Sequence, residues 1–446
     1  MRRLVGFVVM LLVAATVRAQ EFEQYFEDET LRLDYVMGGN AHQAHVYLQQ
    51  AYRQKGWHGR RSRLAETFLK GNGQITVRDH ATQQVIYVWT FSTLFQEWQL
   101  EEEARHTDRA FDASYFIPMP KDTVDITVAL FDRYQHLTTE MTHTLNPHDI
   151  LICPLSAHPQ ALHLPTVPAQ QPQAPRIHIA ILSEGYTATE QDKYAGDCQR
   201  AIQALFEREP FRSLQGYFCF HPVFVPSQES GTSVPHLNAW RTTACYTHFD
   251  TFYSERYLTT QSIHHLYDLL AGVPFEHLIV LVNSDHYGGG GIYNQLTLTT
   301  SDHSTFKEVL VHEFGHAFGG LADEYAYDDM DSPWYLPDTE PWEPNITTLH
   351  DFASKWADMM PAGTPIPTPL DPCVPHYRSI ATGDTASWAR LNACVSRVGV
   401  FEGAGYQSRG CYRPAQECRM KINEVENFCP VCDRAIRRIT QFYVAE

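Results

Sequence analysis

Basic side chains are scarce in this 446-residue chain. It has 34 lysine and arginine residues against 52 aspartate and glutamate residues, which gives a formal net charge of −18. Proteins that bind the phosphate backbone of nucleic acids need a basic surface, and anionic membranes attract the same kind of surface. The deficit of positive charge therefore argues against nucleic acid or an anionic membrane surface as the main partner.

Long apolar runs are also scarce. Arg2 and Arg3 precede an apolar run over residues 4–17 and the small-x-small sequence Val17-Arg18-Ala19. About fourteen apolar residues fall short of the roughly twenty that cross a membrane, so an anchor is the weaker interpretation and a cleaved signal peptide the better one. No later segment reaches spanning length. We therefore predict a signal peptide over residues 1–19 and an exported mature chain, secreted or periplasmic.

Cysteine is absent from the first third of the chain. The first one is Cys153, so no cysteine follows the predicted cleavage site to carry a lipid anchor. Six of the ten cysteines lie between Cys373 and Cys432. In an exported protein this crowding favours disulfides. Cys429-Pro430-Val431-Cys432 is alternatively a redox pair or half of a zinc knuckle, although no second CxxC follows it.

The composition, with 43% hydrophobic and 12% aromatic residues, is that of a folded protein. At about 150 residues per domain, the length allows two or three domains. Residues 20–160 contain segments of alternating polarity that predict an all-β, sandwich-like accessory domain. These segments are residues 31–35, 75–77, 85–89 and 124–130. The proline-rich residues 161–176 predict an extended, unpaired linker.

Residues 177–446 alternate strand and helix signals, which predicts an α/β (α+β) domain. The apolar runs over residues 177–182 and 277–283 are typical of buried strands, and residues 190–207 show helical spacing. Residues 295–301 alternate polar and apolar side chains, as an edge strand does. The glycine run over residues 288–291 lacks the lysine and hydroxyl residue of a phosphate loop, so we predict a turn there rather than a nucleotide site.

The strongest chemical signal is His312-Glu313-Phe314-Gly315-His316. Apolar residues at 306, 309 and 310 predict a helix, on which histidines four positions apart point to one side and can both bind zinc. The glutamate beside the first histidine can hold a water molecule at the metal. The plain alternative is a helix with two surface histidines.

A zinc ion needs a third protein ligand. On an unbroken helix Asp323 would lie about 20° from the face of His312, His316 about 40° and Glu324 about 120°. Asp323 is therefore the favoured third ligand. A helix that ends at Gly319-Gly320 would make Glu324 possible, and a distant residue is the remaining alternative.

Three protein ligands and an open fourth position would let zinc acidify a water molecule and polarise a carbonyl. Glu313 would then act as the general base, taking the proton from the water and returning it to the leaving amine. This chemistry predicts hydrolysis of a peptide bond. An extended substrate would pair with the predicted edge strand over residues 295–301, whose plain alternative is an ordinary sheet edge.

The sequence around this motif resembles the active-site signature of the IgA-peptidase family of zinc metallopeptidases. The resemblance covers nearly the whole mature chain, including the family's β-rich N-terminal domain. The residues that carry it are 312–325, 183–187, 229–232, 249–252, 287–294, 401–406, 412–414 and 418–420, with 31–35 and 95–98 in the N-terminal domain.

The resemblance implies a zinc-dependent endopeptidase with one catalytic zinc ion, bound by His312 and His316, and with Glu313 as the base. The catalytic region is also similar to metzincins, in which the third ligand would fall at Ala322. Alanine has no ligand atom, so this departure moves the third ligand to Asp323.

Three further residues are weaker candidates. Metzincins place a methionine turn beneath the metal, and Met420 is the candidate here, with core packing as the alternative. Tyr406 and Tyr412 are candidates for contacts to the substrate or to a tetrahedral oxyanion, and packing is again the alternative.

Two other functions compete with the endopeptidase. In the first, the β-rich domain binds a glycoprotein or glycan and the catalytic site is secondary, although the HExxH residues are all present. In the second, the zinc site hydrolyses a non-peptide amide or ester. The identity of a protein or peptide substrate, including whether it is immunoglobulin A, and the oligomeric state do not follow from the sequence.

Overall fold

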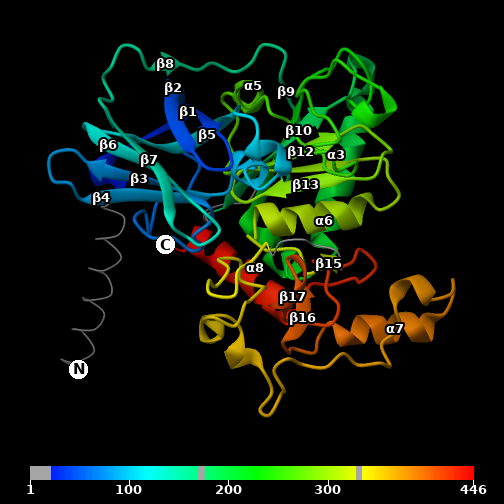
Figure 1. Cartoon of the computed structure of the whole chain (residues 1–446). Coiled ribbons are helices and arrows are strands. Elements are labelled where there is room, and N and C mark those ends of the chain that lie inside the picture. The colour runs from blue at the N-terminus through cyan, green and yellow to red at the C-terminus, as the bar shows by residue number, and fades with distance from the viewer. Residues whose placement is uncertain (1–21, 169–175, 328–333, 446) are drawn as a thin grey trace, which may run out of the picture.

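The computed structural model (Figure 1) describes residues 22–168, 176–327 and 334–445. The predicted signal peptide and the second half of the predicted linker lie outside these residues. Within the described part of the chain, no helix combines the length and apolar character needed to cross a membrane.

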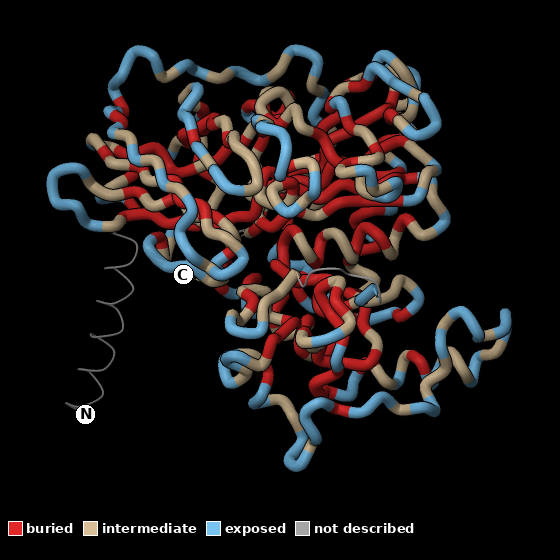
Figure 2. Tube along the Cα trace, in the orientation of Figure 1, coloured by how far each residue is buried: buried red, intermediate tan, exposed pale blue. Residues whose placement is uncertain are grey.

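The N-terminal region consists of two facing sheets of four strands each, in the orders β5-β1-β2-β8 and β4-β3-β6-β7. Inward side chains of both sheets form one core, which appears as the buried tube in the left half of Figure 2. This confirms the predicted β-rich domain. Its strands are β1 (Phe26–Gly39), β2 (Ala44–Lys55), β3 (Gly73–Asp79), β4 (Val85–Phe91), β5 (Arg109–Pro120), β6 (Val124–Phe131), β7 (Leu137–Leu145) and β8 (Cys153–Pro154), and the short helix α2 (Leu94–Trp98) follows β4.

The alternating residues of β1 are buried on both faces of the strand. Leu31, Leu33 and Tyr35 lie in the sandwich core. Arg32, between them, is 1% exposed, because the other face of β1 lies against helix α5 (Ile263–Leu269) of the following region. Its guanidinium donates from Nε to Asp34 Oδ1 at 2.7 Å, from Nη1 to Asp268 Oδ1 at 2.7 Å and from Nη2 to the carbonyl of residue 264. The two regions are therefore joined by an ion pair between the buried Arg32 and the half-exposed Asp268.

The second region is built on a six-stranded sheet in the order β13-β14-β12-β10-β11-β9. The strands β14, β12, β10 and β11 are parallel, and β13 and β9 are antiparallel to their neighbours. Helices α3 and α6 pack on one face and α5 on the other, which confirms the predicted mixed α/β fold. The elements are β9 (Leu162–His163), β10 (Ile177–Glu184), α3 (Gln191–Phe206), α4 (Phe211–Leu214), β11 (Phe218–Phe224), β12 (His277–Val282), β13 (Gly289–Ile292), β14 (Leu296–Thr300) and α6 (Phe306–Ala317).

The edge of this sheet is not where the sequence predicts it. The predicted edge strand is β14, which pairs with β12 on one side and β13 on the other. Thr297 and Thr299 produce its polar alternation, yet both side chains are fully buried. Threonine packs well within sheets, so the alternation does not indicate exposure. The edge is β13, formed by the glycine run for which we predict a turn. A substrate therefore cannot pair with β14.

The first half of the predicted linker is also paired. Strand β9 is antiparallel to β11, and Val167 exchanges backbone hydrogen bonds with Phe220. The prolines of residues 165–168 follow β9, at the outer edge of the sheet, where a missing N–H is tolerated.

The C-terminal part packs beneath α6 (Figure 1). It contains a three-stranded sheet and two helices: β15 (Ala326–Tyr327), α7 (Thr385–Cys394), β16 (Phe401–Ala404), β17 (Tyr406–Arg413) and α8 (Pro430–Val444). The expected disulfides are wrong for this structure, because all ten cysteines lie in described residues and are free. The C-terminal cysteines are divided between an exposed loop, helix α7, strand β17 and one buried cluster: Cys373, Cys394, Cys411, and Cys418 with Cys429 and Cys432.

Acid is expected to weaken the fold through His277. Burial between Phe318 and Tyr443 lowers the pKa of His277 to about 3. In the unfolded chain this histidine binds a proton near pH 6.5. Its contribution to the free energy of unfolding is therefore fully present above that pH and is lost as the pH falls toward 3. Between pH 7 and pH 5 the loss is about 2 kcal/mol.

Urea unfolding at both pH values measures this effect. Changing His277 to phenylalanine should make the free energy of unfolding less dependent on pH by that amount. The same change at His45, which is exposed on β2, should leave the wild-type pH dependence in place. An equal pH dependence in wild type and the His277→Phe variant would exclude this group as a source of acid sensitivity.

Candidate active site

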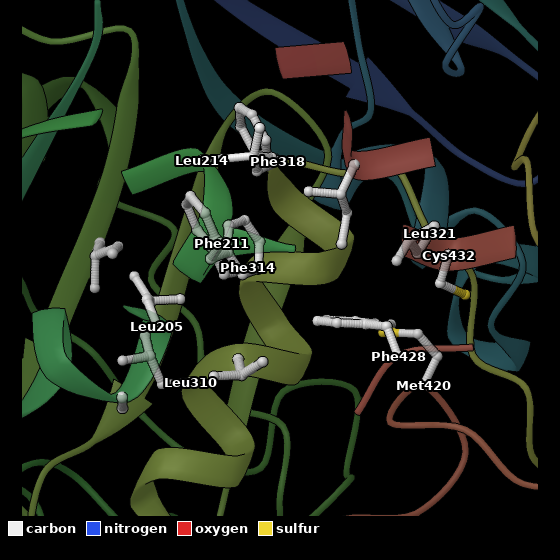
Figure 3. Packing of buried hydrophobic residues seen from close by; sticks show 14 of the residues in the cluster. Leu205, Phe211, Leu214, Leu310, Phe314, Phe318, Leu321, Met420, Phe428 and Cys432 are labelled. Atoms are coloured by element: carbon white, nitrogen blue, oxygen red, sulfur yellow. The ribbon is translucent and has the colours of Figure 1, made fainter. Parts of the chain in front are cut away.

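Helix α6 places the two motif histidines on the side away from its core-facing apolar residues, where their side chains are 13% and 15% exposed. Figure 3 shows Leu310 and Phe314 of this helix among the buried side chains, and Phe314 packs against Phe211 with ring centroids 5.3 Å apart. His312 and His316 lie on another side of the helix, with their Nε2 atoms 3.0 Å apart. The predicted helix and the predicted convergence of its histidines are both present.

Backbone carbonyls orient the two imidazoles. Nδ1 of His312 lies 3.1 Å from the carbonyl oxygen of Arg419, and Nδ1 of His316 lies 2.6 Å from that of Leu321. A carbonyl can only accept, so each Nδ1 carries the proton and donates it. In the neutral tautomers the Nε2 lone pairs are therefore free for a metal ion.

Asp323 reaches these histidines by a turn rather than along the helix. Helix α6 ends at Ala317, and Gly320 adopts a φ of +60°, which reverses the chain. Asp323 Oδ1 then lies 3.0 Å from Nε2 of His312 and 3.3 Å from Nε2 of His316. The unbroken helix on which the sequence argument relied is absent, and the turn places Asp323 beside the histidines by a different path. Glu324 points elsewhere, to Asn345 and Cys432.

The ligand atoms of His312, His316 and Asp323 fit a divalent cation. They lie within 4.8 Å of one another, and Asp323 Oδ1 is buried without a hydrogen-bond partner. Two imidazole nitrogens and a carboxylate oxygen form a donor set that zinc takes in hydrolases. Burial would raise the pKa of Asp323, but the facing imidazoles hold it well below its ordinary value. Burial would lower the pKa of His316, but the Asp323 carboxylate raises it to about 9.

Glu313 extends from the same helix toward strand β13. A Cβ atom on Gly289 would lie 2.8 Å from Glu313 Cγ, and one on Gly291 would lie 2.3 Å from the Glu313 carbonyl oxygen. Only glycine lets β13 approach the helix this closely. Burial raises the pKa of the Glu313 carboxyl, and the neighbouring imidazoles oppose that rise.

These groups lie in a cleft of about 1030 Å³. That volume is at the upper limit of ordinary small-molecule pockets, which are about 300–1,000 Å³. One wall comes from the N-terminal domain, through Gln96 and Glu97 of helix α2. The hydroxyl of Tyr257 donates to Glu97 Oε2 across the domain boundary, and burial raises the pKa of Glu97 to about 7. The N-terminal domain, predicted as an accessory domain, thus forms part of the cleft wall.

Two family models match the chain. One, described as Peptidase M64 N-terminus, matches residues 21–142, and the other, described as IgA Peptidase M64, matches residues 167–378 and 377–440. The chain belongs to the IgA Peptidase M64 family. This confirms the resemblance noted in the sequence and makes the protein a peptidase, whose substrate is a protein or peptide. A comparison with curated proteins found no match.

The weaker candidates of this M64 chain occupy different positions. The hydroxyl of Tyr406 lines the cleft and donates to Asp323 Oδ2 at 2.6 Å. Tyr412, on the same strand, exchanges backbone hydrogen bonds with Thr347 and is not among the residues that line the cleft. Met420 is buried beneath α6, where its sulfur would lie 2.8 Å from a Cβ atom on Gly315.

Sequence reasoning missed Arg256 and Glu97. Arg256 lines the cleft and donates to the hydroxyls of Tyr325 and Tyr327. Neither residue belongs to a motif in which metal ligands or nucleophiles occur at a diagnostic spacing, so the sequence pattern does not single them out. The only signal for Glu97 was the resemblance of residues 95–98 to the family's N-terminal domain.

Proposed function

We propose that this M64 peptidase is a zinc-dependent endopeptidase. The observation that carries the proposal is the convergence of His312, His316 and Asp323 beside Glu313 in a cleft large enough for a stretch of polypeptide. A pocket restricted to a small amide or ester would be expected to be smaller and more enclosed.

The chain's own residues divide the reaction between them. His312, His316 and Asp323 would hold the zinc ion, which when bound supplies Lewis-acid chemistry toward a carbonyl and a water molecule. Glu313 takes a proton from the attacking water and donates it to the leaving nitrogen of the scissile bond. Its buried position favours this exchange, since a carboxyl with a raised pKa gains and loses a proton more readily near neutral pH.

Removal of the metal tests the proposal. Treatment with a chelator should abolish cleavage of a denatured protein substrate, and added zinc should restore it. His312→Ala should lower the zinc content by about one ion per chain and abolish cleavage. His350→Ala, which changes an exposed histidine, is the control and should alter neither. Cleavage that persists after complete metal removal would contradict the proposal.

Tyr406 is expected to act through Asp323. Its hydrogen bond to Oδ2 leaves Oδ1 directed at the imidazoles, so Tyr406→Phe should weaken zinc binding or lower activity by about 10–100-fold. Competition with a chromophoric chelator measures the zinc Kd, and peptide hydrolysis measures kcat/KM. Tyr412→Phe on the same strand is the matched control. Equal effects of the two changes would point to a general disturbance of β17 instead.

We also propose that the mature peptidase is exported, on the basis of the basic and apolar sequence of residues 1–19. Sequencing the N-terminus of protein recovered outside the cytoplasm should give a chain that begins near Gln20. A chain that retains Met1 would contradict this.

A further inference from the structure

A second group of metal-binding side chains lies behind the proposed catalytic centre. Glu324, Cys418, Cys429 and Cys432 are all buried, and their ligand atoms lie within 4.8 Å of one another. Figure 3 shows Cys432 close to Met420 and Phe428, to one side of α6. The four residues come from three separate places in the sequence, so their convergence is a property of the fold.

The distances within this cluster are those of groups that face a common point. The sulfur atoms of Cys418 and Cys432 are 3.8 Å apart, and Cys432 Sγ lies 3.1 Å from Glu324 Oε1. The backbone N–H of Cys429 donates to the sulfur of Cys418 at 3.3 Å. Cys429 and Cys432 occupy the N-cap and third positions of α8, so the first turn of that helix directs both thiols to one side.

Glu324 is the residue that ordinary packing does not explain. It is 0% exposed, and while Asn345 donates to its Oε1, its Oε2 is buried without a partner. A buried carboxylate with an unpaired oxygen is costly unless a cation compensates it. A disulfide would not supply that compensation, since three thiols form only one disulfide and leave the third thiol and the carboxylate as they were.

We propose that Glu324, Cys418, Cys429 and Cys432 bind a second, structural metal ion of the zinc type. Three thiolates and a carboxylate give the four protein ligands of a closed tetrahedral site, which leaves no position for a water molecule or substrate. Thiolate ligands favour zinc over the hard cations magnesium and calcium. The CxxC at residues 429–432 would thus supply two of the four ligands, and Glu324 and Cys418, from two other segments of the chain, would supply the other two in place of a second CxxC.

Such an ion would fix the two segments that complete the catalytic centre. Glu324 directly follows Asp323, and its N–H donates to the carbonyl of Met420 at 2.8 Å. Cys418 directly precedes Arg419, whose carbonyl accepts from His312. The second site therefore fixes the positions of Asp323, a proposed catalytic ligand, and of the Arg419 carbonyl that orients His312. It takes no part in the reaction itself.

The test uses a double variant, His312→Ala with His316→Ala, which lacks the proposed catalytic centre. After dialysis, this variant should retain about one zinc ion per chain by elemental analysis. Its cobalt-substituted form should show thiolate-to-cobalt charge-transfer absorption, and X-ray absorption of the zinc form should show sulfur at about 2.3 Å. These measurements do not depend on activity, so they separate this proposal from the catalytic one.

Cysteine variants locate the ion. In the double-variant background, Cys429→Ser should lose the zinc and the charge-transfer absorption. Cys219→Ser should keep both, although Cys219 lies with His178 and His221 in another group of possible ligands. Absence of metal from the folded double variant would overturn the proposal, as would a Cys418–Cys432 disulfide found by mass spectrometry or zinc that depends on Cys219 instead.

Discussion

Replacing Glu313 with glutamine is expected to lower kcat/KM for peptide hydrolysis by about two to four orders of magnitude, while zinc content stays at the wild-type value. Glutamine keeps the shape of the side chain, so it fits the narrow space opposite Gly289. It cannot take a proton from water or return one to the leaving nitrogen. The measurements are hydrolysis of a fluorogenic peptide and elemental analysis of the same preparation.

Glu308→Gln is the matched control for this change. Glu308 lies in the first turn of the same helix and is not among the residues that line the cleft. Its replacement should leave the rate and the zinc content close to wild type. A Glu313→Gln enzyme with normal zinc and normal activity would exclude Glu313 as the base, whereas loss of zinc would show that the variant disturbs the ligands instead.

Removing the Arg32 side chain is expected to lower the free energy of unfolding by about 3–5 kcal/mol. The Arg32–Asp34 ion pair is buried, with side chains 1% and 4% exposed. Arg32→Ala would leave the Asp34 carboxylate buried without its cation and would also remove the contact with Asp268. Urea unfolding followed by circular dichroism and by tryptophan fluorescence measures the loss, and shows whether the two domains still unfold together.

Arg105→Ala provides the comparison. Arg105 pairs with Glu102 at the surface, where both side chains are more than half exposed, and such pairs are worth about 1 kcal/mol or less. If Arg32→Ala and Arg105→Ala lowered the free energy of unfolding equally, the contacts of Arg32 would contribute no more than a surface ion pair. The domains would then be held together by their apolar contacts.

Elements encoded by local spacing could be predicted from the sequence. In β1, β3 and β6 the inward apolar residues occupy every second position, and in α6 the apolar residues recur at helical spacing. These elements, and the convergence of His312 with His316, therefore follow from local geometry. Helical spacing favours Asp323 as the third ligand, but the path that places Asp323 beside the histidines is a turn at Gly320. An argument from helical angles does not describe that turn.

Features that depend on distant parts of the chain could not be predicted. The edge position of β13 depends on the order of the whole sheet, and threonine alternation in β14 resembles an exposed edge although those side chains pack inside. The position of Glu97 in the cleft depends on how one domain docks on the other. The four groups around Glu324 are brought together only by the tertiary fold.

The wall that α2 contributes means that the active unit of this peptidase is the pair of domains. A catalytic fragment made without the first 160 residues would keep every proposed zinc ligand, yet it would lack Gln96 and Glu97 and would expose the face of α5 that Arg32 covers. Chimeras that exchange N-terminal domains between M64 peptidases would therefore alter the shape of the cleft and the choice of substrate. They would do so without changing a single residue of the HExxH helix.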